Sequence, residues 1–267
     1  MVLGLHCPVI RGYDAALEIA KKHSCLAMQM LPYRRHHDPS AEELTAFRAA
    51  REAAGIRLLA HSRFVPSLAS SDDARRARSV ELLARELELS MSLGAEAYVL
   101  HAGAFSPEGN AEDGIKLCAA SIASAKPALP VLVENVPGGG RRLGGSLEEL
   151  RALVDAARKA GVDAHACLDT AHAWSAGYDL STADAALKFL ARVHRVLGAD
   201  NVRAFHLNDS RALLGSRVEN HAAWGAGHLR AEALSALLAR EEYAATLGIL
   251  EPPPGEEEAA WAVLKKN

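Results

Sequence analysis

The sequence lacks any segment that could cross a membrane, since none of its apolar runs approaches about 18 residues. Its first apolar run, residues 2–5, is too short for the core of a signal peptide and is broken by His6 and Pro8. With no membrane segment and no targeting segment, we expect a cytoplasmic protein without a membrane partner.

Cysteine is scarce, and its spacing excludes a thiolate zinc site. The four cysteines form no Cys-x-x-Cys pair, and three of them lie within or beside segments that resemble strands. We therefore expect reduced core residues and no disulfide framework. They are Cys7, Cys25, Cys118 and Cys167.

An excess of one charge is also missing. The chain has 30 Lys and Arg against 33 Asp and Glu, a formal net charge of −3 at pH 7. This excludes a globally basic surface, so a nucleic-acid partner would have to bind a local group of cations. At 267 residues the chain could form two small domains, but α/β barrels of this length form one.

The sequence does contain seven apolar runs that each end on a side chain able to bind a metal ion. They read LGLH, IRLLAH, AYVLH, VLVE, HACLD, VRAFH and LGILE, and they end at His6, His61, His101, Glu134, Asp169, His206 and Glu251. In a barrel of parallel strands the C-terminal ends meet at one mouth, so these residues would converge. Four imidazoles and three carboxylates suit borderline-soft divalent metals, above all zinc. One such histidine alone is more often an ordinary residue at a sheet edge, but seven equivalent positions favour a metal centre.

Strand-like and helix-like segments alternate along the chain. Helical periodicity covers residues 14–22, 41–54, 74–93 and 147–160. Gly55, Gly94 and Gly161 are placed to end helices, and Ser146 to begin one. Eight strands are expected at residues 2–6, 25–30, 56–60, 96–101, 131–135, 164–169, 202–207 and 247–251. We therefore predict an α/β fold, a (β/α)8 TIM barrel, as a single domain over residues 1–267. A doubly wound open sheet is the alternative, but it would not gather residues from every strand.

Further polar residues follow the last strands. His172 comes three residues after Asp169, in what we expect to be a loop, and Asn208 and Asp209 after His206 could hydrogen-bond to metal ligands. In the next loop Glu219 and His221 are two positions apart, so an extended backbone would point both the same way. Such a pair is usually just solvated, but its place after the seventh strand favours metal binding.

Four strings in this chain resemble the endonuclease IV family, the type 2 apurinic/apyrimidinic (AP) endonucleases of deoxyribonuclease IV type, in the xylose isomerase-like TIM barrel superfamily. The strings are residues 133–135 (VEN), 167–179 (CLDTAHAWSAGYD), 206–210 (HLNDS) and 215–218 (GSRV), and the resemblance extends from Gly4 to Glu251. It implies a trinuclear zinc centre that hydrolyses the DNA phosphodiester 5′ to an abasic site in base excision repair. The implied partner is damaged double-stranded DNA, and we expect a monomer.

The resemblance also implies which residues hold the metals. His61, His101 and Glu134 would hold one ion. Glu134 would bridge to a second ion held by Asp169, His206 and Glu251. His172, His221 and residue 219 would hold the third. About three Zn²⁺ ions per chain are expected, and Mn²⁺ could replace one of them. Glu134 or Glu251 would orient the attacking water, which makes these two the expected catalytic residues.

The sequence departs from the family pattern in the third metal site and in two loops. Glu219 stands where the family usually has Asp. The loop at residues 32–37 lacks the usual Asn and Trp pattern, although Arg35 falls where an intercalating Arg is expected, and Phe64 replaces a usual Tyr. We expect the DNA contacts to come from Tyr33, Arg35, Arg63, Phe64 and Arg217. These side chains could equally be ordinary loop residues.

A second function class uses the same barrel. Sugar isomerases and epimerases of this superfamily hold a single metal between Glu, Asp, His and Glu at strand ends. Such an enzyme moves a proton beside a carbonyl group and does not need His61, His101, His172 or His221. These additional histidines favour the nuclease. The quartet that would serve the isomerase consists of Glu134, Asp169, His206 and Glu251.

Overall fold

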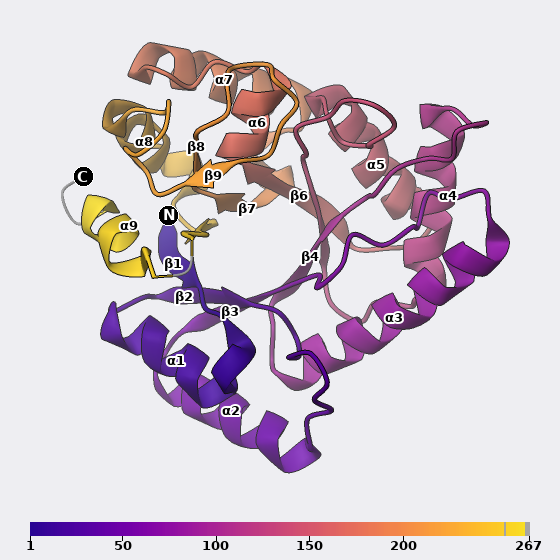
Figure 1. Cartoon of the computed structure of the whole chain (residues 1–267), viewed down its shortest axis with the longest axis horizontal. Helices are drawn as coiled ribbons and strands as arrows, with labels where there is room; N and C mark the ends of the chain where they lie inside the picture. The colour runs from indigo at the N-terminus through magenta and orange to yellow at the C-terminus, as the bar shows by residue number, and fades with distance from the viewer. Residues whose placement is uncertain (254, 265–267) are drawn as a thin grey trace.

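The computed structural model describes residues 1–253 and 255–264, and there it shows a closed barrel of eight parallel strands (Figure 1). The barrel closes because β1 pairs with both β2 and β10. The strands are β1 (Val2–His6), β2 (Ala27–Met30), β3 (Arg57–His61), β4 (Ala97–His101), β5 (Val131–Glu134), β6 (Ala164–Asp169), β7 (Val202–His206) and β10 (Leu247–Leu250). The predicted TIM barrel is thus confirmed.

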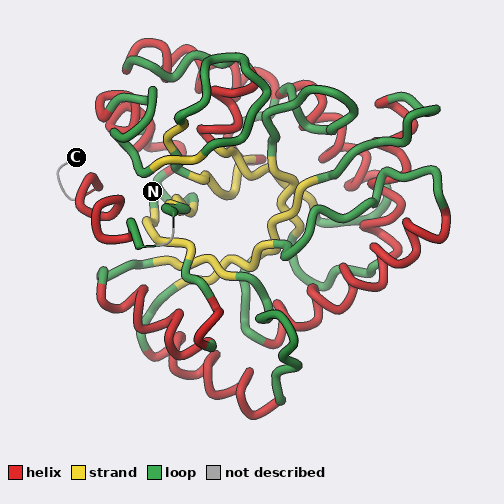
Figure 2. Tube along the Cα trace, in the orientation of Figure 1, coloured by secondary structure: helices red, strands yellow, loops and turns green. Residues whose placement is uncertain are grey.

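The helices form a ring outside the strands (Figure 2). They are α1 (Tyr13–Lys22), α2 (Ala41–Ala53), α3 (Asp73–Ser92), α4 (Ala111–Ser124), α5 (Leu147–Lys159), α6 (Thr170–Ala176), α7 (Ala183–Val196), α8 (Ala231–Leu238) and α9 (Glu257–Leu264), with short 3-10 turns at Val9–Arg11, Ala199–Asn201 and Glu241–Tyr243. Between β7 and α8 lies a small antiparallel hairpin of β8 (Asp209–Ser210) and β9 (His221–Ala222). Over the described part of the chain, no helix combines the length and apolarity needed to cross a membrane.

The helix ends follow the predicted signals. Gly55, Gly94 and Gly161 each follow a helix with positive φ, at 68°, 74° and 88°. The Ser146 hydroxyl accepts a hydrogen bond from the Glu149 amide at 3.1 Å and caps α5. Most boundaries lie within one residue of the prediction, and the largest difference is in the second strand, which was expected to begin at residue 25 but begins at Ala27. The Cys25 amide instead donates to the Ala20 carbonyl and closes the end of α1.

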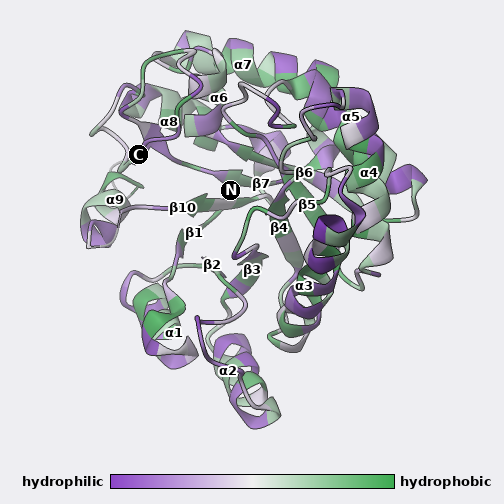
Figure 3. Cartoon of the chain, turned by 45° about the vertical axis from the view of Figure 1, so that its right-hand side comes forward, coloured by the Kyte–Doolittle hydropathy of each residue, from purple (hydrophilic) through white to green (hydrophobic). Residues whose placement is uncertain are grey.

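The core has two layers, one inside the barrel and one between the barrel and the helices. Apolar side chains that alternate along the strands fill the barrel, among them Leu59, Val99 and Leu132. Figure 3 shows strands that are largely hydrophobic inside helices in which hydrophilic and hydrophobic residues alternate. Because successive residues alternate, the side chain two positions beyond each inward residue also faces the lumen, nearer the C-terminal mouth. All four cysteines are buried free thiols.

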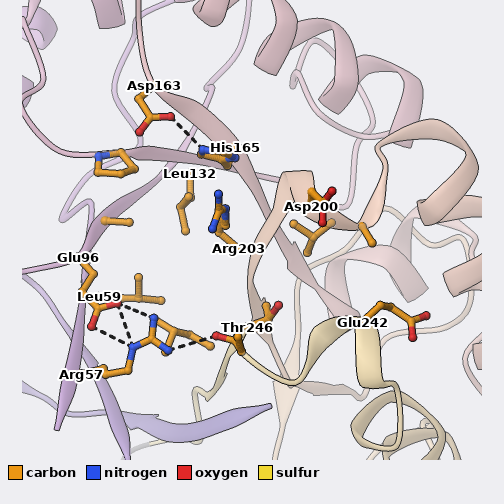
Figure 4. A pocket seen from close by; sticks show the side chains of 16 residues that line it. Arg57, Leu59, Glu96, Leu132, Asp163, His165, Asp200, Arg203, Glu242 and Thr246 are labelled. Atoms are coloured by element: carbon orange, nitrogen blue, oxygen red, sulfur yellow. Dashed lines mark hydrogen bonds and ion pairs between the residues drawn. The ribbon is translucent and has the colours of Figure 1, made fainter. Parts of the chain in front are cut away.

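A pocket of about 410 Å³ opens at the opposite, N-terminal end of the barrel (Figure 4). It lies between the first residues of several strands, where Arg57 forms an ion pair with Glu96 at 2.6 Å and His165 contacts Asp163 at 2.9 Å. The two ends of the barrel therefore carry different polar groups, and the side chains predicted to bind metal belong to the other end.

Candidate metal centre

All seven side chains predicted to share the mouth do lie at the C-terminal ends of the strands. Six of them are the last residues of β1, β3, β4, β5, β6 and β7, and Glu251 directly follows β10. The strand alternation explains their direction, because each lies two positions beyond a lumen residue such as Gly4, Leu59, Val99, Leu132, Cys167, Ala204 or Ile249. The centre is thus an extension of the barrel core in which polar side chains replace apolar ones.

Glu134 lies in the middle of the cluster and is 1% exposed. One carboxylate oxygen, Oε2, is 3.1 Å from His61 Nε2 and 2.9 Å from His101 Nε2. The other, Oε1, is 2.9 Å from His206 Nδ1. The two oxygens therefore face two different groups of imidazoles, as a bridging carboxylate requires.

Asp169 is both a member of the cluster and the N-cap of α6. Its Oδ1 accepts a hydrogen bond from the His172 amide at 2.6 Å. The expectation that His172 lies in a loop is therefore wrong: it lies in the first turn of α6, and the spacing of three residues is that of a capped helix. The other carboxylate oxygen, Oδ2, is 3.7 Å from His221 Nε2.

The third group of side chains comes from α6 and the β8–β9 hairpin. His221 Nε2 is 3.2 Å from His172 Nε2, and Glu219 Oε2 is 3.7 Å from the same His172 atom. The Glu219 side chain is 52% exposed, and the neighbouring His172 imidazole lowers its pKa to about 2. Glu219 and His221 thus face His172 together, as their extended spacing predicts.

Asp209 has a different place from the one expected. Its buried carboxylate accepts hydrogen bonds from the amides of Gly225, Gly227 and Leu229 at 2.9, 2.8 and 2.7 Å. It therefore organises the loop that follows β9 and does not orient a cluster residue directly. Of the two predicted supporting residues, only Asn208 contacts the cluster, donating to Asp169 Oδ2 at 2.6 Å and Glu251 Oε2 at 2.9 Å.

Hydrogen bonds to backbone carbonyls indicate which ring nitrogen carries the hydrogen in two of the histidines. His61 Nδ1 lies 2.8 Å from the Ser62 carbonyl, and His172 Nδ1 lies 2.8 Å from the Asn135 carbonyl. A carbonyl only accepts, so in the neutral rings these Nδ1 atoms carry the hydrogen and the Nε2 atoms carry lone pairs. The lone pairs face the Glu134 carboxylate and the His221 ring. Lone-pair atoms that face one another in this way could bind a cation placed between them.

The electrostatics of the cluster point the same way. Burial alone would raise the pKa of Glu134, but the imidazoles of His206 and His101 hold it well below its ordinary value. Burial alone would lower the pKa of His172, but Asp169 and Glu134 raise it well above its ordinary value. The carboxylates thus favour positive charge among the imidazoles, and divalent cations would supply it.

Four overlapping groups in the cluster each place three ligand atoms within 4.8 Å of one another. They share residues with the three ligand sets implied by the sequence resemblance but divide them differently. Asp169 is grouped with His172 and His221, His61 is also grouped with His206 and Glu251, and Glu219 lies beside the groups. Nitrogen and oxygen donors in this mixture suit zinc. The groups are His61–His101–Glu134, Glu134–Asp169–His206, His61–His206–Glu251 and Asp169–His172–His221.

Sequence analysis missed Gln29, which is fully buried beside the cluster. Gln29 lies on β2 and faces the barrel lumen, in register with His6. The end of β2 carries none of the predicted metal-binding side chains. The available signal was a polar residue in the otherwise apolar run CLAMQM, but Gln is not a metal-binding type. Asn135 was missed as well, and its side chain holds the Asp169 backbone at 2.6 Å and 3.1 Å.

The side chains predicted to contact DNA fall into separate places around the mouth. The Arg63 guanidinium lies 5.4 Å from the Tyr33 ring centre and 5.8 Å from that of Phe64, which is 51% exposed, so these three form one cluster. Arg35 is exposed in the neighbouring loop. Arg217 is exposed in the β8–β9 loop and donates to the Pro137 carbonyl at 3.3 Å.

Exposed apolar side chains in the β8–β9 loop were also missed. Leu213, Leu214 and Val218 are 70%, 46% and 54% exposed. They belong to the loop that carries Arg217 and Glu219, so apolar and cationic groups occur on the same segment. No periodicity marks a loop, so the sequence offered no signal beyond the residue types themselves.

Comparison with known proteins agrees with these features. The family model described as xylose isomerase-like TIM barrel matches residues 17–266. The endonuclease 4 of a strain of Thermus thermophilus is 38% identical over 223 residues, which cover 83% of this chain and 78% of that protein. A probable endonuclease 4 of Solibacter usitatus is 35% identical over 237 residues, covering 85% of this chain and 81% of that one.

Solved structures show the same relationship. The crystal structure of endonuclease IV from another strain of Thermus thermophilus superimposes with a TM-score of 0.85 at 32% identity, covering 100% of both chains. A D-tagatose 3-epimerase-like protein superimposes with a TM-score of 0.76 at 18% identity, covering 100% of this chain and 96% of that one, which shows the shared barrel alone. Because the similarity to the endonucleases spans most of both sequences as well as the fold, the chain belongs to the endonuclease 4 family of xylose isomerase-like TIM barrels.

Proposed function

We propose that this protein is an AP endonuclease that hydrolyses the DNA phosphodiester 5′ to an abasic site, as part of base excision repair. The observation that carries the proposal is the convergence of nine candidate ligands at the barrel mouth, with the buried Glu134 carboxylate among them. We propose about three ions, mostly Zn²⁺ with Mn²⁺ able to replace one. The ligands are His61, His101, Glu134, Asp169, His172, His206, Glu219, His221 and Glu251.

Bound divalent ions would polarise the phosphate, help a water molecule lose a proton near neutral pH and stabilise the departing oxygen. The protein residues have separate tasks. Glu134 holds its two oxygens toward separate imidazole groups, and Glu251 is fixed at the mouth by Asn208. We assign these two carboxylates to orienting the attacking water, with Glu134 as the bridging residue.

Recognition of the DNA falls to the loops around the mouth. The Tyr33–Arg63–Phe64 cluster combines aromatic faces with a cation and suits insertion beside a missing base. Arg35 and Arg217 would bind backbone phosphates, because an exposed guanidinium forms strong hydrogen bonds with phosphate oxygens. We further propose that the chain acts as a monomer in the cytoplasm, as one domain over residues 1–267.

The single-metal isomerase or epimerase is the second candidate. Two observations favour it. The barrel resembles that of the epimerase-like protein, and the mouth contains the four ligand types that such an enzyme uses, in Glu134, Asp169, His206 and Glu251. It leaves unexplained why His61, His101, His172 and His221 converge on the same carboxylates. We therefore rank it below the endonuclease.

A labelled duplex with one tetrahydrofuran abasic analogue tests the proposal, because this analogue cannot be cleaved by β-elimination. Metal-loaded protein should cut 5′ to the analogue and leave a 3′-hydroxyl. Glu134→Gln should abolish cleavage while it changes DNA binding little, since the substitution removes a bridging oxygen and no DNA contact. An intact duplex, together with conversion between ketoses by the same preparation, would establish the epimerase instead. Elemental analysis that finds one ion per chain would point the same way.

A further inference from the structure

Gln29 is the lumen residue of β2 at the level where the neighbouring strands place candidate metal ligands. It pairs with His6 in β1 and with Leu59 in β3, two positions before His61. Its side chain is fully buried, and its amide contacts three members of the mouth. These are Glu251 Oε1 at 2.6 Å, His206 Nε2 at 2.8 Å and His6 Nδ1 at 3.2 Å.

These contacts allow only one orientation of the amide. A carboxylate accepts and does not donate, so the amide nitrogen must face Glu251, and its second hydrogen then points to His6 Nδ1. The amide oxygen faces His206 Nε2, which must therefore be the donor. It follows that neutral His206 carries its hydrogen on Nε2 and neutral His6 carries its hydrogen on Nε2 as well.

The consequence for His206 concerns its other nitrogen. Its Nδ1 then holds a lone pair and lies 2.9 Å from Glu134 Oε1 and 3.5 Å from Glu251 Oε2. This is the direction in which a metal ligand must point. The same amide also holds one oxygen of Glu251, which leaves the other oxygen facing His206 and Asn208. One buried side chain thus orients two candidate ligands of a single ion.

The consequence for His6 is different, because it was the one residue of the seven strand ends without an implied metal. Its Nδ1 accepts from Gln29, so its hydrogen is on Nε2. No described residue accepts a hydrogen bond from this Nε2, and the side chain is 26% exposed at the mouth. A neutral ring fixed in this way offers a hydrogen-bond donor to a substrate oxygen and does not compete for the metal.

We propose that Gln29 is a positioning residue which, through one amide, sets His206 as an Nδ1 metal ligand, orients Glu251 and holds His6 as an Nε2–H donor. The inference rests on the metal centre of the proposed function but not on the cleavage of DNA. Outer hydrogen bonds of this kind typically contribute about 10- to 100-fold to metal affinity.

Two substitutions separate the donor and acceptor roles. Gln29→Met keeps the length of the side chain and removes both the donor and the acceptor. Gln29→Glu keeps an oxygen that accepts from His206 Nε2–H. As a carboxylate, it donates neither to Glu251 nor to His6. The matched control is Met28→Leu in the same strand, because Met28 is fully buried on the opposite face, against the helices.

Two measurements are made on zinc-loaded protein: zinc retained per chain against a chelator series, and histidine tautomers by long-range ¹H–¹⁵N NMR. Wild type and Met28→Leu should show Nε2–H tautomers for both histidines. Gln29→Met should hold one ion about 10- to 100-fold more weakly. Gln29→Glu should keep the His206 tautomer and change that of His6.

Full zinc affinity and both Nε2–H tautomers in Gln29→Met would overturn the inference. If Gln29→Met does not fold, Gln29→Glu decides it, since an unchanged His6 tautomer there would overturn it equally. Failure of wild-type protein to cut the abasic duplex would refute the proposed function, but it would leave these readouts and this inference standing.

Discussion

At the residue scale, Glu219 differs from the other carboxylates of the candidate metal centre because its side chain is half exposed, at 52% against 19% or less for the others. Asp169 and Glu251 accept hydrogen bonds from the buried Asn208 amide and Glu134 contacts buried imidazoles, whereas Glu219 lies in a loop and contacts His172. Its removal should therefore affect the metal without affecting the core.

The first prediction is that Glu219→Ala releases one ion and slows incision of the abasic duplex by an order of magnitude or more. The thermal unfolding temperature of the metal-free protein should fall only slightly, because solvent screens the interaction of a half-exposed loop carboxylate with His172. Glu219→Asp, which restores the residue usual in the family, is the matched control and should retain the ion. Metal analysis and initial rates measure both effects. Unchanged metal content in the Ala variant would show that Glu219 is only a loop residue.

Glu86 is a second unusual residue, a carboxylate buried in α3 beneath the loop that carries Arg63 and Phe64. Its Oε2 accepts from the Tyr98 hydroxyl and from the Arg63 amide at 3.1 Å, while Oε1 has no hydrogen-bond partner among the described residues. Burial raises the pKa of Glu86 above its ordinary value. Its contribution to stability is therefore complete below the unfolded-state pKa and is lost as the pH rises through the folded-state pKa.

We predict that Glu86→Gln stabilises the metal-free protein at pH 7, by roughly 1 kcal/mol, because it removes a buried charge but keeps an acceptor for Tyr98 and Arg63. The corresponding increase in Tm is about 2–3 °C. Near pH 4, where the wild-type carboxyl is protonated, the difference should disappear. Thermal unfolding at the two pH values measures it. If Glu86→Gln instead lowered the stability equally at both pH values, the buried charge would have no effect on stability.

At the scale of elements, the β8–β9 hairpin is the part of the mouth that does not belong to the barrel. It carries His221 and Glu219, and its position depends on the Asp209 carboxylate, which gathers the amides of the following loop. The fit is close, since a Cβ added to Gly227 would lie 2.3 Å from the Ser210 carbonyl oxygen. The positions of His221 and Glu219 therefore depend on the hydrogen bonds of the Asp209 carboxylate.

We predict that Asp209→Asn loosens the hairpin and costs roughly 3 kcal/mol, because the new NH2 group faces amides that need an acceptor. Hydrogen exchange should increase in residues 210–229, and one metal ion should bind more weakly, while the barrel strands stay protected. Asp179→Asn is the control, because Asp179 caps only the exposed turn at Ser181. Equal increases in exchange for the two variants would show that Asp209 has no special role.

At the scale of the whole molecule, the charge distribution decides how DNA can bind. The net charge of −3 gives no general attraction to a polyanion. Binding must therefore come from the few arginines around the mouth, among them Arg35, Arg63 and Arg217. The opposite end of the barrel has arginines of its own, among them Arg203 in the pocket of Figure 4.

We predict a shallow salt dependence of DNA binding, with a slope of log K against log salt of about −3 to −5, since only a few phosphates are neutralised. Arg35→Ala should weaken binding and reduce the slope by about one while the metals stay bound. Arg203→Ala, at the far end of the barrel, should change neither. Fluorescence anisotropy over a salt series gives the slopes. A slope as steep as about −10 would require a basic surface that this chain lacks.

The sequence alone determined the barrel and the main members of the metal centre. Strand ends are local features, and in a parallel barrel all of them must point to the same mouth, so His61, His101, Glu134, Asp169, His206 and Glu251 could be placed together without coordinates. Helix caps such as Ser146 were equally local. For the same reason the predicted boundaries were correct to within about two residues.

Only the tertiary structure decided the roles of Gln29, Asp209 and His172. Their functions depend on partners far away in the chain, such as Glu251 for Gln29, and no periodicity encodes a hydrogen bond between β2 and the end of β10. The orientation of the His61, His172 and His206 rings was also decided there, because a backbone carbonyl or a buried amide selects the nitrogen that faces the candidate metal site. The sequence supplies the donor types, and the packing of the barrel determines which lone pair each donor presents.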